Sequence, residues 1–135
     1  MPHNKKKTDL IISCFYDSFS TALPVGFDWA QTLNQQFGEK YNVTILLHGE
    51  NIKYGLSNAA YFETYGVDNP WASFLLAAMA HKVKVVICLL GLTKDGFTIS
   101  QLLIGIKPVQ FSIDFIAQSQ LKGKLVIYDA QITPI

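Results

Sequence analysis

The chain has 135 residues, the size of one globular domain; half of them are apolar and only 16% are charged, against about 25% in typical domains. This composition excludes a disordered chain and leaves more apolar surface than a small domain usually buries, so we expect a sheet covered on both faces or a subunit interface. The formal charge of +1, from 11 basic and 10 acidic side chains, provides no field to attract nucleic acid or an anionic membrane.

The N-terminal segment is polar and basic, and a short apolar run follows it. Residues 1–7 are expected to form a flexible, solvated tail. Residues 10–15 are too few for the core of an export signal or for a membrane span. Two cysteines, Cys14 and Cys88, make neither a disulfide framework nor a metal-ligand pair, and they fit a reducing compartment. We therefore expect one cytoplasmic domain over residues 1–135, without a metal or a cofactor.

In the first half of the chain, apolar blocks of strand length alternate with longer periodic blocks, which is typical of βαβ units. The pattern predicts a strand over residues 9–16, a helix over 26–40 and a second strand over 43–48. Residues 51–69 leave two alternatives open, an extension of the strand and short helical segments.

The second half begins with a clear helix start. Asn69 can accept a hydrogen bond from the first free amides, and Pro70 suits the first helical position because its missing N–H has no partner to lose. This helix is predicted to end near Lys82. The strand that follows, over residues 84–90, is the most hydrophobic and is expected at the centre of the sheet.

The remaining segments complete an alternating pattern. Gly123 is well placed to end the last helix in the left-handed conformation. Five strands with intervening helices predict a three-layer α/β/α sandwich around a mostly parallel sheet, with flavodoxin-like layering. The last predicted segments are a turn over 93–96, a helix over 98–103, a strand over 108–111, a helix over 113–121 and a strand over 124–128.

Candidate chemistry gathers where strands end, because ligands of open α/β sheets bind beyond the carboxyl ends of the strands. These positions hold Cys14, Tyr16 and Asp17 after the first strand, His48, Gly49 and Glu50 after the second, and Cys88 and Gly91 after the third.

Cys88 is the sharpest candidate. A thiol at a strand end can be reached from the crevice, and a nearby helix N-terminus or histidine would favour the thiolate, the form that a nucleophile or persulfide carrier needs. The alternative is a buried cysteine acting as a small hydrophobe. Cys14 has a similar position among core-like neighbours, and the two thiols would form a redox pair only if their strands brought them together.

His48 and Glu50 form a second candidate, because a carboxylate can orient an imidazole that transfers protons near neutral pH. The alternative is a histidine bonded to a loop carbonyl. His81, at a predicted helix end, is interpreted as a capping cation. Isolated glycines do not make a phosphate loop, and there is no serine-nucleophile elbow, so a flavodoxin-type cofactor binder is the weakest hypothesis.

Several segments, in this order and spacing, resemble the DsrE/DsrF-like family. The sequence Leu46-Leu47-His48-Gly49-Glu50 is similar to a strand-end His-Gly segment of that family, and Val83 to Cys88 resembles its strand ending in a cysteine. Residues 65–70 resemble a Gly-x-x-Asn-Pro segment found in one subgroup. Residues 103–106 and 116–123 match a loop and the last helix, so the resemblance covers roughly residues 43–128.

The resemblance implies five parallel strands, a homo-oligomer (trimer or hexamer) and sulfur relay, in which a persulfide is carried on the cysteine and passed to sulfur-carrier proteins. By position, Cys88 would bear the sulfur, and His48, Gly49 and Asn69 would line the same cleft. The chain departs from the family pattern at Leu89-Leu90, where a small or polar residue is usual, and at Lys82, where glycine is usual. A drier pocket would disfavour the thiolate.

The sequence therefore supports two principal hypotheses. The first is a sulfur-relay protein that uses Cys88 in intracellular sulfur metabolism. The second is a non-catalytic oligomeric module that binds a small ligand or a protein partner in the same crevice. The residues alone do not decide whether the chain is an enzyme.

Overall fold

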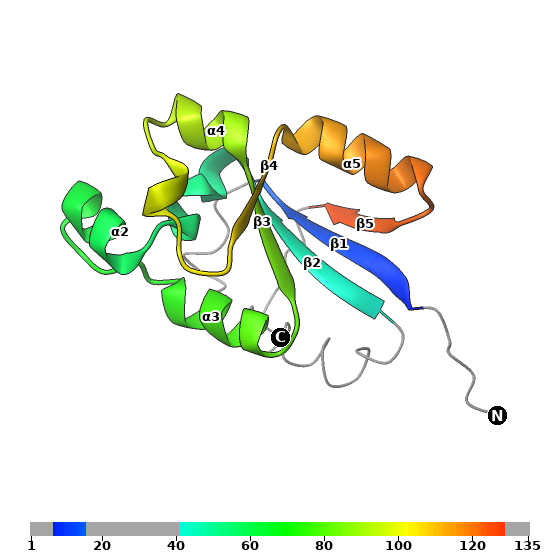
Figure 1. Cartoon of the computed structure of the whole chain (residues 1–135), viewed down its shortest axis with the longest axis horizontal. Helices are drawn as coiled ribbons and strands as arrows, with labels where there is room; N and C mark the ends of the chain where they lie inside the picture. Colours follow the sequence, from blue (N-terminus) through cyan, green and yellow to red (C-terminus); the bar gives the residue numbers. More distant parts are fainter. Residues whose placement is uncertain (1–6, 16–40, 129–135) are drawn as a thin grey trace, which may run out of the picture.

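The computed structural model describes residues 7–15 and 41–128, which form a five-stranded sheet with helices on its faces (Figure 1). The strand order is β4-β3-β2-β1-β5, and every pairing is parallel. The predicted α/β class is confirmed, with a sheet that is wholly parallel. The strands are β1 (Thr8–Cys14), β2 (Tyr41–Leu47), β3 (Lys84–Cys88), β4 (Lys107–Val109) and β5 (Leu125–Tyr128).

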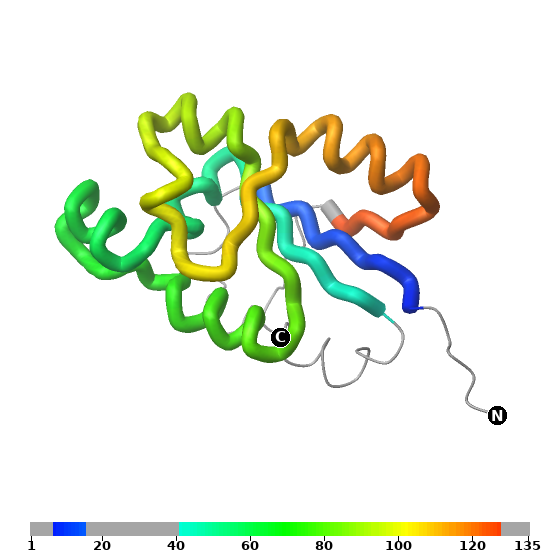
Figure 2. The backbone as a smooth tube through the Cα atoms, viewed as in Figure 1, coloured from blue at the N-terminus to red at the C-terminus, as the bar shows by residue number. Residues whose placement is uncertain are grey.

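Helices occupy the connections from β2 onward, and the trace in Figure 2 shows α3 on one side of the sheet and α4 and α5 on the other. The predicted helix over 26–40, residues 1–6 of the predicted tail, Tyr16 and Asp17 lie outside the described residues. The helical segments are η1 (Gly49–Gly55), α2 (Asn58–Tyr65), α3 (Ala72–Ala80), α4 (Leu89–Lys94), η2 (Ile99–Gln101) and α5 (Ser112–Leu121), of which η1 and η2 are 3-10 helices.

The two faces of the sheet carry different side chains, because successive residues of a strand point to opposite faces. Parallel register places Ile12 beside Ile45 and Ile45 beside Val85, so these three share one face. Ser13 pairs with Leu46 and therefore belongs to the other face. Both faces are buried at these positions, as expected for a parallel sheet covered by helices.

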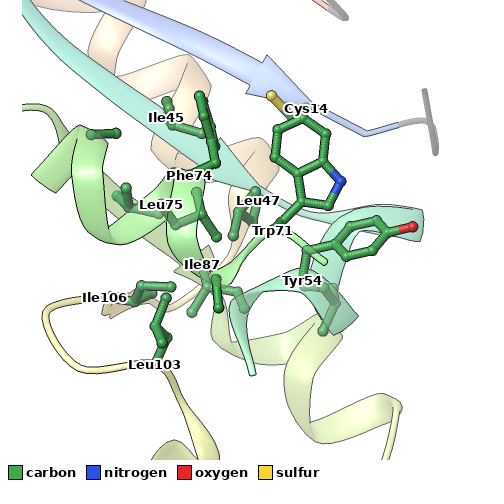
Figure 3. Packing of buried hydrophobic residues seen from close by; sticks show 14 of the residues in the cluster. Cys14, Ile45, Leu47, Tyr54, Trp71, Phe74, Leu75, Ile87, Leu103 and Ile106 are labelled. Carbon is green, nitrogen blue, oxygen red and sulfur yellow. The ribbon is translucent and has the colours of Figure 1, made fainter. Parts of the chain in front are cut away.

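The main hydrophobic core lies between the first of these faces and α3 (Figure 3). Trp71, Leu75 and Leu47 are each 0% exposed. Removing such a side chain from water stabilises the fold by roughly 1.5–3 kcal/mol. The side chains of Trp71, Phe74, Leu75 and Ala78 are buried along α3, and Met79 is partly buried against the same core.

The N-cap of α3 is Trp71 and not the predicted Asn69, so Pro70 also lies before the helix. Asn69 instead supports the turn that leads into α3, since its Oδ1 accepts a hydrogen bond from the backbone N–H of Trp71 at 2.9 Å. Its Nδ2 also donates to the carbonyls of Tyr54 (2.9 Å) and Leu56 (2.7 Å). The side chain is 5% exposed, so these bonds satisfy groups that would otherwise be buried without partners. Asn69 thus ties the start of α3 to the end of η1.

Two expectations for the third strand are wrong. It ends at Cys88 rather than residue 90, because residues 89–94 form α4. It lies second from an edge of the sheet, and β2 is the central strand. An unbroken apolar run indicates that a strand is buried on both faces, which is true of both β2 and β3, and it does not indicate the order of the strands.

Three other segments also differ from expectation or resolve an open alternative. The predicted turn over 93–96 begins inside α4. The helix predicted over 98–103 is only η2, held by a capping box between Thr98 and Gln101. Within the ambiguous residues 51–69, the structure has the rest of η1 and all of α2, so the helical alternative holds. Gly123 follows α5 with φ +79, as predicted.

Candidate functional site

A pocket of about 960 Å³ opens at the carboxyl ends of β1, β2 and β3, the edge at which open α/β sheets bind ligands. The segments after β2 and β3 and the start of α5 complete its walls. The residues that line it are Ser13, Phe15, His48, Gly49, Glu50, Lys53, Tyr65, Cys88, Leu90, Gly91, Lys94, Asp95, Phe111, Ser112, Ile113 and Ile116.

Cys88 is the last residue of β3 and lines the pocket, although its side chain is only 4% exposed. Its Sγ accepts a hydrogen bond from the backbone N–H of Ser112, with 3.4 Å between nitrogen and sulfur. Ser112 is the first residue of α5, and the first amides of a helix have no carbonyl partner within the helix. One of these amides is therefore used to hold the sulfur.

His48 follows β2 directly, and its imidazole is held by Ser13. The distance from Ser13 Oγ to His48 Nε2 is 2.6 Å, and both side chains are buried, at 1% and 7% exposed. The backbone N–H of His48 also donates to the carbonyl of Cys14 at 3.2 Å, which continues the pairing of β2 with β1. The ring orientation is thus fixed from both main chain and side chain.

His48 and Cys88 occupy equivalent positions on neighbouring strands. The last register pair of β2 and β3 is Leu47 with Ile87, and both chains stay extended for one more residue, with φ −153 and ψ 177 at His48 and φ −69 and ψ 113 at Cys88. Adjacent strands lie about 4.8 Å apart, and side chains at matching positions leave on the same face. Both side chains therefore leave on the pocket face of the sheet, and both line the pocket.

Phe15 and Gly49 close one side of the pocket around His48. The Phe15 and His48 rings meet edge to face, with centroids 5.2 Å apart. Gly49 has φ +58, and a Cβ atom there would come within 2.6 Å of the Phe15 ring. Only glycine combines this left-handed backbone with so close an approach.

The mouth of the pocket is apolar, with charges at its margin. Leu90, Phe111 and Ile113 are 55%, 39% and 64% exposed. The charged residues that line the same pocket are two lysines and two acids, which are Lys53, Lys94, Glu50 and Asp95. Their charges balance, so the opening favours neither anions nor cations by net charge.

Five of the residues singled out from the sequence meet in this pocket, and two do not. Those that line it are His48, Gly49, Glu50, Cys88 and Gly91. Cys14 points to the opposite face, where it belongs to the core against α3. Asn69 is in the loop before α3, where it holds backbone groups. The two cysteines do not form a redox pair, since β2 lies between their strands and they face opposite ways.

Sequence reasoning missed Ser13, Phe15 and Ser112. Ser13 had a detectable signal, because it is the one hydroxyl in the apolar run Leu10 to Phe15, and period-2 alternation places it on the face opposite Cys14. Ser112 contributes through its backbone amide, and no side-chain pattern reports such a contact.

Taken together, these features define an open parallel α/β domain with a thiol, an imidazole and a hydroxyl at its carboxyl edge. No protein-family model matches the chain, and no curated protein matches it. Among the described residues, no helix is long and apolar enough to cross a membrane.

Several solved structures share the fold. A protein of unknown function, MTH1491 from Methanobacterium thermoautotrophicum, aligns with TM-score 0.74 and 15% identity over 90% of this chain and 99% of its own. A second, BT1422 from Bacteroides thetaiotaomicron, has TM-score 0.65 and 15% identity over 90% and 94%. The ychN protein from E. coli has TM-score 0.64 and 19% identity over 91% and 99%. At these identities the comparisons establish the fold alone.

Proposed function

We propose that this protein carries sulfur as a persulfide on Cys88, as a member of the DsrE/DsrF-like sulfur-relay proteins in the cytoplasm. The observation that carries the proposal is the place of Cys88: it lines the same pocket as His48, and its sulfur accepts the first amide of α5. The likeness to YchN, whose fold is DsrE-like, supports the assignment at the level of fold.

The proposed reaction is a transfer of sulfane sulfur. The Cys88 thiolate attacks the outer sulfur of a donor persulfide, R–S–SH, so a new S–S bond forms at Cys88 while the S–S bond of the donor breaks. The donor leaves as R–S⁻ and takes up the proton that Cys88 gave up. The sum is Cys88–SH plus R–S–SH giving Cys88–S–SH plus R–SH, which requires no external oxidant or reductant. Release to an acceptor thiol is the same step with the roles exchanged.

The surroundings of the sulfur suit this step. The Ser112 N–H points at the sulfur, and a hydrogen bond to the charged form of a group favours that form, here the attacking thiolate. His48 lies on the neighbouring strand and can exchange a proton near neutral pH. The pocket is large enough for a small persulfide or for a side chain of a partner protein.

The proposal includes association into a homo-oligomer, a trimer or hexamer, and exchange with sulfur-carrier proteins. The apolar residues exposed together at the pocket mouth support association, since monomeric domains seldom leave large apolar patches in water. Leu90, Phe111 and Ile113, which line the same pocket, are 55%, 39% and 64% exposed.

A second candidate function is a non-catalytic module that binds a ligand or partner in the same pocket. The low exposure of the Cys88 sulfur and the apolar mouth favour it. In that case the thiol would be inert in the native protein while the pocket still bound an apolar probe.

Intact-protein mass spectrometry after treatment with a persulfide donor separates the two. We expect the wild type to gain the mass of one sulfur atom and Cys88→Ser to gain none. Cys14→Ser is the matched control, because it removes an equally buried cysteine from the other face, and it should gain sulfur as the wild type does. A gain that persists in Cys88→Ser, or no gain in folded wild type, would refute the sulfur-relay function.

A further inference from the structure

Ser13 has a hydroxyl in the middle of an otherwise apolar strand, and it is 1% exposed. Burying a hydroxyl without a partner costs a few kcal/mol, so its partner must be specific. That partner is His48, with 2.6 Å between Oγ and Nε2. The bond joins β1 to the residue just after β2, on the pocket face of the sheet.

A serine hydroxyl suits a histidine that changes its charge. Its oxygen can accept a hydrogen bond from Nε2–H, because a hydroxyl has two acceptor sites. In that tautomer Nδ1 is the nitrogen that gains a proton, and Nε2–H donates to Ser13 in both the neutral and the charged ring. His48 can therefore gain and lose a proton at Nδ1 while this contact stays satisfied, although it is only 7% exposed.

We propose that Ser13 is a positioning residue for sulfur transfer: it orients His48 and satisfies it in both protonation states, so that His48 takes the Cys88 proton and returns it to the departing thiolate. This inference rests on the proposed sulfur-relay function. The thiol loses a proton to the imidazole as its sulfur attacks, and the leaving R–S⁻ takes that proton, so no proton is gained or lost overall.

Other titratable groups surround the pair and would contribute to any pH profile. Glu50 and Lys53 of η1, Tyr65 of α2, and Lys94 and Asp95 at the end of α4 line the same pocket. A pH dependence alone would not identify His48. The test therefore depends on variants that change the Ser13 hydroxyl and leave all of these groups in place.

The variants are Ser13→Ala, Ser13→Thr and Ser13→Val. Threonine and valine have nearly the same shape and differ in the hydroxyl, so any folding cost of the added methyl groups is largely shared by the two. Two quantities are measured from pH 5 to 9: the rate of sulfur uptake by Cys88, and the proton NMR shift of the His48 ring. General acid–base steps contribute about 100-fold or more, so we expect loss of the hydroxyl to slow uptake by roughly tenfold or more.

We expect Ser13→Thr to keep the wild-type pH profile and His48 titration, and Ser13→Ala and Ser13→Val to lose both. Ser119→Ala is the matched control for loss of a buried serine bond, since Ser119 is 3% exposed and donates to the Phe115 carbonyl at 2.6 Å, away from the pocket. It should leave both readouts unchanged. Equal rates and equal titrations in folded Ser13→Thr and Ser13→Val would overturn the inference.

Alkylation of Cys88 by iodoacetamide, which needs no sulfur donor, separates this inference from the proposed function. If sulfur uptake is normal and equally fast in Ser13→Thr and Ser13→Val, the sulfur-relay function stands and the role of Ser13 is rejected. If the wild type takes up no sulfur, but Cys88 is alkylated at different rates in Ser13→Thr and Ser13→Val, the sulfur-relay function is rejected and the coupling from Ser13 through His48 to Cys88 stands.

Discussion

Cys14 and Cys88 lie on opposite faces of one sheet and are almost equally buried, at 8% and 4% exposed. The Cys14 thiol is packed in the core against α3, and its sulfur contacts the carbonyl of Ile12 in its own strand at 3.9 Å. Cys88 also belongs to this core, but its sulfur receives the Ser112 N–H and the residue lines a pocket. Two thiols with nearly the same exposed fraction therefore have different surroundings, because they leave from opposite faces of the sheet.

The difference arises from the two-residue period of a strand. Cys14 ends β1 on the same face as Leu10 and Ile12, which pack on α3, whereas Ser13 leaves on the face of His48 and Cys88. Two thiols at the ends of parallel strands thus reach different environments. The following predictions test whether the face packed against α3 and the face that lines the pocket differ in stability and in thiol reactivity.

The largest effect is expected from Trp71→Ala, on the α3 face. Loss of a fully buried tryptophan should lower the free energy of unfolding by about 3–5 kcal/mol, measured by urea denaturation, and should increase alkylation of Cys14 more than that of Cys88. Phe111→Ala on the pocket face, where the ring is 39% exposed, should cost under about 2 kcal/mol. Equal losses in the free energy of unfolding for Trp71→Ala and Phe111→Ala would contradict the difference between the packed face and the pocket face.

A smaller effect is expected from Gly49→Ala, on the pocket face. A left-handed backbone costs a residue with a Cβ about 1–2 kcal/mol, and the added methyl would press on the Phe15 ring at 2.6 Å. Gly66→Ala is the matched control, because Gly66 has φ +76 and open space around its Cβ position.

The difference in unfolding free energy between these two glycine variants measures the crowding against Phe15, which we expect to add about 1 kcal/mol or more. Gly49→Ala should also change the alkylation rate of Cys88 and leave that of Cys14 as in wild type. Unchanged Cys88 reactivity would show that Phe15 and Gly49 do not shape access to the sulfur.

The smallest effect is expected at Asp9. This residue lies near the start of β1, whereas both cysteines lie at the carboxyl ends of their strands. A hydrogen bond from Asn42 at 3.1 Å lowers the pKa of Asp9 more than partial burial raises it, and Lys124 at 3.5 Å lowers it further. A pKa lower in the folded state means that this stabilisation is present above the unfolded pKa of about 4 and is lost as pH falls through the folded pKa.

Asp9→Asn should therefore lower stability slightly at neutral pH, by under about 1 kcal/mol for this half-exposed carboxylate, and the loss should vanish in acid. Thermal unfolding from about pH 7 to about pH 2.5 measures this. Asp68→Asn, an exposed aspartate before α3, controls for the removal of one negative charge. Any change in the reactivity of Cys88 or Cys14 would contradict the separation of this end of the sheet from the site.

The fold was largely predictable because strand-length apolar blocks, the Asn-Pro pair shortly before α3 and the glycine after α5 are local signals. The end of β3 was not, because Leu89 and Leu90 suit a strand as well as a helix, and α4 forms where the carbonyl of Gln110 accepts the N–H of Leu90 at 3.2 Å. That contact joins residues distant in sequence, so no local pattern reports it.

The site was predictable in part for the same reason. Strand ends identified Cys88, His48 and Gly49, since their position follows from the order of apolar blocks. The role implied for Asn69 in the cleft came from resemblance, and the structure instead places it among backbone carbonyls. The bond from Ser13 to His48 required knowing that β1 and β2 are neighbours and in which register they pair.

One edge of the sheet is formed by β4, which has three residues and carries Pro108 at its centre. Proline offers no amide to an incoming strand, and the exposed Lys107 beside it would bring a charge into any added ladder. Pairing of the β4 edge strands of two copies of this chain would therefore form few backbone hydrogen bonds. The same short strand that completes the fold also protects it from fibril-like growth on that side.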